Sequence, residues 1–143
     1  MLSMSCKYAL RALVYIMSKK AGAKRMGIKE IATAIEANVH TTAKILQLLA
    51  REELIHSAKG PTGGFYALPD VAPVYLIQVV RLIDGDAFFV ACGLGLKQCS
   101  DKKPCPIHDS FKEARTSLHK QFCSITIQQL AKDIAKGNTF LKR

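Results

Sequence analysis

Residues 28–68 read IKEIATAIEANVHTTAKILQLLAREELIHSAKGPTGGFYAL, and this stretch decides the fold. Apolar residues recur at helical spacing within 28–37, which predicts an amphipathic helix there. A short turn at 38–39 separates it from a second amphipathic stretch at 41–53, which predicts another helix. Two helices joined by a tight turn are typical of a helix-turn-helix, although the same pattern also occurs in many helical proteins that bind no DNA.

The next part of this stretch, residues 54–68, predicts a β-hairpin. Residues 54–58 and 65–68 are short strand-like runs, and the segment between them, GPTGG at 60–64, consists of turn-forming residues. A hairpin that follows two short helices gives the element order of a winged helix-turn-helix. In that fold the second helix enters the major groove of DNA, and the hairpin, called the wing, reaches the flanking backbone or the minor groove.

Helices are also predicted on both sides of this region, at 5–20, 74–83 and 126–135, with a long one that begins near Asp109. The long helix carries an apolar stripe whose spacing is close to a heptad repeat. Such a stripe predicts that the helix pairs with a second copy of the chain. The members of the stripe are Phe111, Ala114, Leu118, Phe122 and Ile125.

The predicted fold class is therefore mainly α with a small β-hairpin: a winged helix-turn-helix followed by a long C-terminal dimerisation helix. The length of 143 residues suits one compact unit. Within it we expect the winged helix-turn-helix DNA-binding domain at residues 1–70. Residues 71–143 then hold a linker helix, a cysteine-rich loop and the dimerisation helices.

The chain is strongly basic, with 21 Lys and Arg against 11 Asp and Glu, and a formal net charge of +10. The charge is spread along the chain, because residues 1–70 carry ten basic and five acidic residues, and residues 71–143 carry eleven and six. This balance predicts a polyanionic partner, either nucleic acid or an acidic membrane surface. No segment approaches the roughly 20 apolar residues that span a bilayer. The apolar run near the N-terminus is interrupted by Arg11 and lacks a cleavage site, so we expect a cytoplasmic protein.

The start of the second predicted helix and the tip of the wing offer groups that could contact DNA. His40, Thr41, Thr42 and Lys44 lie in the first turns of that helix, and Lys59 lies at the wing tip. Hydroxyl groups can read base edges or hold phosphate, and a helix N-terminus attracts phosphate. A lysine on the wing can meet phosphate or the minor groove. The alternative is that these side chains simply face water.

Residues 91–110 read ACGLGLKQCSDKKPCPIHDS and gather Cys92, Cys99, Cys105 and His108 in one loop. Structural zinc sites usually contain pairs of cysteines separated by two to four residues, and no such pair is present here. Widely spaced thiols in a glycine-containing loop suit an iron–sulfur cluster, around which the loop can wrap. Zinc stays open as an alternative. Ordinary thiols also stay open, although three cysteines in a polar, lysine-rich loop are poorly explained as core.

The remaining cysteines and charges of the chain are less informative. Without an export signal we expect a reducing compartment, so the five cysteines do not indicate a disulfide framework. We expect Cys6 and Cys123, which lie on apolar helices, to belong to the core. Lys97, Lys102 and Lys103 are expected to lower the pKa of nearby thiols.

The sequence has no evident Ser/His/Asp set, paired carboxylates or phosphate loop, so we predict that the chain is not an enzyme.

The sequence as a whole resembles the Rrf2 family of bacterial winged-helix regulators, which includes iron–sulfur and nitric-oxide sensors of the IscR and NsrR types. The resemblance covers essentially the full length. The segments that carry it are KYALRAL (7–13), IKEIA (28–32), KILQLL (44–49), LIHSAKGPTGGFYAL (54–68), IQVVRLIDG (77–85) and the set of Cys92, Cys99, Cys105 and His108. It implies a cytoplasmic homodimer whose long C-terminal helices pair, and one cluster per subunit that controls affinity for a palindromic operator in double-stranded DNA.

Several positions depart from the family pattern. The family often has an aromatic residue and a leucine where this chain has Thr41 and Thr42, and an arginine where it has Lys59. The first two loop cysteines are one residue further apart than in IscR-like proteins. The nitric-oxide sensors use an acidic ligand from the partner's first helix, and the matching position here is Lys7, which cannot take that role. Because His108 matches the fourth ligand of the IscR type, the resemblance favours a [2Fe–2S] cluster with three Cys and one His ligand over a [4Fe–4S] cluster or zinc.

The function predicted from the sequence is that of an iron–sulfur-dependent DNA-binding transcriptional regulator, which senses cluster supply, an oxidant or nitric oxide. In this reading the cluster fixes the loop at 92–108 against the partner's helices and so biases the spacing of the two recognition helices. Two alternatives stay open. One is a winged-helix DNA-binding protein with structural zinc, and the other is a small iron–sulfur redox protein.

Overall fold

The computed structural model describes residues 1–19 and 24–142 and confirms the predicted class, mainly α with a small antiparallel hairpin. The last residue of the predicted helix at 5–20 lies outside the described residues. The short α5 was not predicted, because four residues are too few to show a helical period. The elements are α1 (Met4–Ser18), α2 (Ile28–Ile35), α3 (Val39–Arg51), β1 (His56–Ala58), β2 (Gly64–Tyr66), α4 (Leu76–Asp84), α5 (Ala87–Val90), α6 (His108–Ser124) and α7 (Ile127–Ala135).

The turn between α2 and α3 is built by local backbone and side-chain chemistry. Glu36 adopts a left-handed backbone conformation with φ of 56° and ends α2. Asn38 caps α3, because its side-chain oxygen accepts a hydrogen bond from the backbone N–H of Thr41 at 2.7 Å. α3 therefore begins at Val39, two residues before the start that the periodicity predicts.

The wing is a two-stranded hairpin with a third segment beside it. β1 pairs antiparallel with β2, with His56 opposite Tyr66. Met26 extends this sheet on the other edge, because its backbone N–H donates to Phe65 at 2.9 Å and its carbonyl accepts from the Phe65 N–H at 2.8 Å. Both strands are shorter than predicted, and Leu68 lies outside the sheet with 47% of its surface exposed.

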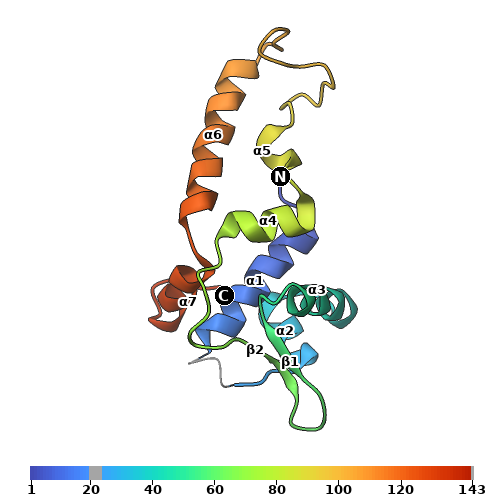
Figure 1. Cartoon of the computed structure of the whole chain (residues 1–143), viewed down its shortest axis with the longest axis vertical. Coiled ribbons are helices and arrows are strands. Elements are labelled where there is room, and N and C mark those ends of the chain that lie inside the picture. The colour runs from blue at the N-terminus through green and yellow to red at the C-terminus, as the bar shows by residue number, and fades with distance from the viewer. Residues whose placement is uncertain (20–23, 143) are drawn as a thin grey trace.

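α1 is the centre of the molecule. It contacts α2, α3, α4 and α7 as well as β2, and Figure 1 shows it running between α7 on one side and the α2–α3 pair on the other. Its inward residues, such as Leu13 and Ile16, are almost completely buried, and Ile127 of α7 shares their core cluster. No helix within the described residues is long and apolar enough to cross a membrane.

Main-chain hydrogen bonds join the segment between the wing and α4, residues 72–76, to the start of α7. The Ile127 N–H donates to the Val74 carbonyl at 2.8 Å, and the Leu76 N–H donates to the Ile125 carbonyl at 3.0 Å. The Gln128 side chain adds two more bonds to the same segment, to the backbone of residues 72 and 74. This pairing holds Tyr75 in extended backbone, which explains why α4 begins at Leu76 and not at the predicted residue 74.

α6 packs against the rest of the chain along only part of its length. Figure 1 shows α6 and α5 extending away from the body formed by α1, α2, α3 and α7. In the predicted apolar stripe, Phe111 and Leu118 are 40% and 37% exposed. Phe122 differs, because it packs against Phe88 and Phe89 of α5 within the same chain. The N-terminal part of the stripe, from Phe111 to Leu118, is therefore the part that is open to a partner.

We predict that Gly64→Ala strongly destabilises the wing. Gly64 has φ of 144°, and a Cβ there would lie 2.7 Å from the Met26 carbonyl oxygen, so the bridge to Met26 would have to open. The free energy of unfolding, measured by urea denaturation, should fall by about 2–4 kcal/mol. Gly60→Ala is the matched control, since Gly60 also has positive φ but no atom within 4 Å of an added Cβ. Equal losses in the two variants would contradict this account.

Candidate functional site

The structure brings the three loop cysteines together beyond the end of α5. The sulfur atoms of Cys92, Cys99 and Cys105 all lie within 4.8 Å of one another, and the Cys92 and Cys105 sulfurs are 3.7 Å apart. All three side chains are half-buried, and none is in a disulfide bond. This is the only group of three or more close Cys, His, Asp or Glu ligand atoms in residues 1–19 and 24–142.

His108, the predicted fourth ligand, lies at the first position of α6 and reaches this cluster. Its Nδ1 is 3.1 Å from the sulfur of Cys99, and only 9% of the residue is exposed. Its other ring nitrogen, Nε2, is 2.9 Å from Oδ1 of Asp101, a residue of the loop itself. The same carboxylate oxygen accepts a hydrogen bond from Nζ of Lys112 at 2.7 Å.

The first turns of α6 also hold the beginning of the loop. A Cβ at Gly93 would lie 2.8 Å from the ring of Phe111, so only glycine lets the backbone pass so close to that ring. The guanidinium of Arg115 stacks on the same ring at 5.4 Å and donates hydrogen bonds to the carbonyls of Val90 and Ala91. Those carbonyls are orphan acceptors at the end of α5, and the bonds from Arg115 fix the backbone that leads into the cysteines.

The hydrogen bonds around the thiols make the cysteines unequal. The pKa of Cys92 is lowered to about 7, because the backbone N–H groups of Leu96 and Leu94 donate to its sulfur. The backbone N–H of Cys105 lowers the pKa of Cys99, but desolvation and the neighbouring thiols outweigh it, so the net shift is upward. The backbone N–H groups therefore favour the thiolate form of Cys92, and further thiolates beside it require a compensating cation.

The lysines of the loop do not have the predicted effect on these thiols. Lys97, Lys102 and Lys103 are exposed, and the main groups that lower the Cys92 pKa are backbone N–H groups. Within the described chain, Lys112 is the only lysine whose side chain enters the hydrogen bonds of the site, through Asp101. The hydrogen bonds from Lys112 and His108 hold the pKa of Asp101 down to about 2, so this carboxylate is ionised at neutral pH.

The donor set fits a thiophilic metal centre. Three thiols and one imidazole are the ligands that zinc and iron–sulfur clusters share. The four side chains form two close pairs, Cys92 with Cys105 and Cys99 with His108. The carboxylate on the far nitrogen of His108 is also the usual outer partner of a metal-bound histidine.

The predicted DNA-contact residues divide into exposed and buried ones. His40 and Lys44 are exposed on α3, Thr41 is half-buried, and Lys59 is exposed on the wing. Thr42 is completely buried, and its hydroxyl donates to the Asn38 carbonyl at 2.8 Å. The prediction that Thr42 contacts DNA is therefore wrong, because its side chain points into the core and supports the turn.

Further basic and polar groups lie near the same elements and were missed by sequence reasoning. Gln47 and Arg51 are exposed and continue the face of α3 that begins with His40 and Lys44. Helical spacing from His40 could have found both of them. The guanidinium of Arg25 lies 5.5 Å from the ring centre of Tyr66 on the wing. No local pattern shows this contact, because it depends on the pairing of residue 26 with the sheet.

The two remaining cysteines differ from each other. Cys6 is buried as predicted, and burial raises its pKa to about 12. Cys123 is exposed, so the prediction that it belongs to the core is wrong. Phe122, the residue before it, takes the inward position toward α5. The sulfur of Cys123 lies 3.7 Å from Nδ1 of His119, one helical turn earlier.

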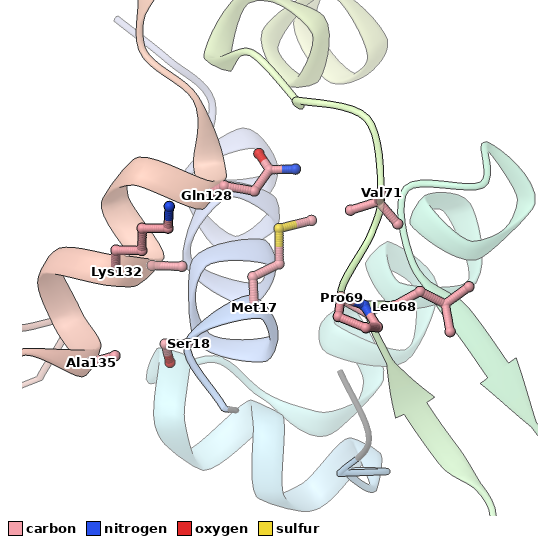
Figure 2. A pocket seen from close by; sticks show the side chains of 10 residues that line it. Met17, Ser18, Leu68, Pro69, Val71, Gln128, Lys132 and Ala135 are labelled. Carbon is pink, nitrogen blue, oxygen red and sulfur yellow. The ribbon is translucent and has the colours of Figure 1, made fainter. Parts of the chain in front are cut away.

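A separate cavity of about 260 Å³ lies between α1, the end of the wing and α7 (Figure 2). Figure 2 shows Met17 of α1 between Lys132 and Gln128 of α7 on one side and Pro69 and Val71 on the other. Its lining is largely apolar, and it contains none of the residues predicted to bind metal or DNA. The cavity is therefore distinct from the thiol cluster.

Comparison with known proteins gives a consistent assignment. Residues 2–133 match the model of the Rrf2 family, described as an iron-dependent transcriptional regulator. A protein of Aquifex aeolicus named as an HTH-type transcriptional regulator is 28% identical over 127 residues, which cover 87% of this chain and 86% of the relative.

Two solved structures share the fold. One is CymR, the global cysteine regulator of B. subtilis, with a TM-score of 0.71, 20% identity, and coverage of 96% of this chain and 97% of that one. The other is IscR of T. potens, with a TM-score of 0.69, 18% identity, and coverage of 97% and 91%. Since the matching family comprises transcriptional regulators, the prediction that the chain is not an enzyme is confirmed. The chain belongs to the Rrf2 family of winged-helix transcriptional regulators.

Proposed function

We propose that this regulator binds an iron–sulfur cluster through Cys92, Cys99, Cys105 and His108, and that the state of the cluster sets its affinity for DNA. The observation that carries the proposal is the convergence of three loop thiols, one of which lies 3.1 Å from the imidazole at the start of α6. When bound, such a cluster supplies sensitivity to iron supply, oxidants or nitric oxide. The description of the family as iron-dependent supports iron as the metal.

The four side chains could supply two ligands to each iron of a [2Fe–2S] cluster, once Cys99 and His108 move apart from Cys92 and Cys105 to admit it. A cluster with two irons needs two ligands on each iron. The 3.7 Å separation of the Cys92 and Cys105 sulfurs suits one pair, and the 3.1 Å separation of the Cys99 sulfur and His108 Nδ1 suits the other. A [4Fe–4S] cluster needs one ligand on each of four irons, so close pairs are not expected for it.

A regulator with a single zinc ion is the second candidate, and one observation favours it. Two thiolates on one tetrahedral ion with bonds of about 2.3 Å lie about 3.8 Å apart, close to the 3.7 Å between Cys92 and Cys105. All three sulfurs also lie within 4.8 Å of one another. The small redox carrier, the third reading of the sequence, is set aside because the family comprises transcriptional regulators.

The contacts of α6 suggest how the site could act on DNA binding. α6 holds both ends of the cysteine loop through Arg115 and His108, and its last turn leads directly into the segment that pairs with residues 72–76. Residues 72–76 follow the wing in the chain, so this pairing connects α6 to the DNA-binding elements. In a homodimer formed through α6, a change in the loop would shift the two DNA-binding units relative to each other, which alters the fit to a palindromic operator.

We expect metal analysis to separate the two candidate centres. Purified without oxygen, the protein should be brown and contain about two irons and two sulfides per chain. Replacing any one of Cys92, Cys99 and Cys105 with Ala should abolish the cluster, and His108→Ala should leave a substoichiometric or rapidly decaying one. Cys123→Ala is the matched control and should keep the full content, because Cys123 lies on α6 outside the site. A colourless protein with about one zinc per chain would contradict the iron–sulfur proposal.

We expect Leu118→Glu to convert a dimer into monomers, because it places a charge in the exposed part of the apolar stripe. Leu118 is preferable to Phe122, whose replacement would disrupt packing against α5. Light scattering should give twice the 15.7 kDa chain mass for the wild type and the chain mass for the variant. Thr116→Glu adds the same charge on the opposite face of α6 and should stay dimeric. A wild-type protein that is monomeric at micromolar concentration would rule out this interface.

We expect DNA binding to weaken steeply with salt, and Lys59→Ala to weaken it for all sequences alike. Loss of one phosphate contact should reduce the slope of log K against log salt by about 1. Lys136→Ala is the control, because Lys136 follows α7, which lies across α1 from α3 in Figure 1. The measurement is a salt titration of operator binding by fluorescence anisotropy. Equal slopes for the wild type and Lys59→Ala would remove Lys59 from the interface.

A further inference from the structure

We propose that Asp101 is a positioning residue that fixes the tautomer and ring orientation of His108, so that Nδ1 faces the thiols. This inference rests on the proposed function, because it gives His108 its role as a ligand. It concerns a residue that is not among the site residues predicted from the sequence.

The hydrogen bonds of the imidazole carry the inference. Asp101 Oδ1 lies 2.9 Å from Nε2 of His108, and an ionised carboxylate can only accept hydrogen bonds. The proton of the neutral imidazole must therefore reside on Nε2. Nδ1 then presents a lone pair, and it is the nitrogen that lies 3.1 Å from the sulfur of Cys99. The far carboxylate thus leaves the near nitrogen free to bind a metal.

Lys112 keeps the carboxylate in place. Its Nζ donates to the same Oδ1 atom at 2.7 Å. Lys112 lies four residues after His108, so the two side chains emerge from the same face of α6.

A simpler role for Asp101 would be to tie the loop to α6 without affecting the tautomer. Asp101→Asn separates the two roles. The amide can keep the tie by accepting a hydrogen bond from Lys112, but its NH₂ group can also donate to Nε2. Donation to Nε2 favours the wrong tautomer, with the proton on Nδ1, as happens when an aspartate that orients a catalytic histidine is replaced by asparagine.

The first measurement is the tautomer in the full-length, metal-free protein. Long-range ¹H–¹⁵N NMR of ¹⁵N-histidine-labelled protein reports which ring nitrogen carries the proton, and His108→Gln assigns the signal among the four histidines. The wild type should show the proton on Nε2. Asp101→Asn should shift a large part of the population to Nδ1–H. Asp109→Asn, the matched control, removes a charge one residue from His108 without touching its hydrogen bonds, and should match the wild type.

The second measurement is binding of Co²⁺, a spectroscopic probe of thiolate and imidazole ligation, under anaerobic conditions. Asp101→Asn should weaken the affinity by about 10–100-fold, the usual effect of losing such an outer partner. Asp101→Glu should restore part of it, because a carboxylate is again available, while Asp109→Asn should leave it unchanged.

The outcomes distinguish this inference from the proposed function. Wild-type tautomer and affinity in Asp101→Asn would overturn the inference. Weakened Co²⁺ binding with an unchanged tautomer would also overturn it, because Asp101 would then only tie the loop. If the wild type binds neither Co²⁺ nor an iron–sulfur cluster, the proposed function fails, and the NMR comparison still decides whether Asp101 sets the tautomer.

Discussion

The burial of α1 is the constraint on which the rest of the structure depends. Leu13 and Ile16 anchor the core that α1 shares with the helix-turn-helix, the wing and α7. Cys6, in the first turn of the same helix, packs with Val80 of α4 and Phe89 of α5 in a second cluster. Each large apolar side chain buried in this way contributes about 1.5–3 kcal/mol. α1 therefore joins the winged helix-turn-helix to α4 and α5, which lead into the cysteine loop.

The sequence predicted the fold well wherever a helix has one strong apolar face. α2 and α3 were found from periodicity, and their ends moved by only a few residues because Asn38 caps α3 and Glu36 adopts a left-handed turn. The strand pairing with Met26 and the ladder between residues 72–76 and 125–127 could not be predicted. Both join residues far apart in the sequence through backbone atoms, which carry no side-chain signal.

The candidate site also contains residues that the sequence predicted and residues that it did not. The three cysteines and His108 stand out in the sequence by residue type and spacing. The structure brings the three sulfurs within 4.8 Å of one another and places His108 beside Cys99, and their role as ligands stays a prediction. Thr42 was misjudged because a threonine one turn into a helix can face either side, and here its hydroxyl bonds to the Asn38 carbonyl in the core. The role of Arg115 was not predicted from the sequence, since an isolated arginine on an exposed helix usually faces water. Its partners are carbonyls 24 and 25 residues away.

The loop differs from the core in what holds it. Its apolar residues Leu94 and Leu96 are about half exposed, so hydrophobic burial contributes little to its shape. Polar contacts from α6 set it instead, through Arg115 at its start and His108 with Lys112 at its end. A site held by a few hydrogen bonds can change its chemistry without loss of the fold. This is consistent with the same fold in CymR, a cysteine regulator, and in IscR at 20% identity or less. The chemistry of the thiol cluster in this chain therefore depends on the side chains of residues 92–112, because the fold that carries them does not determine it.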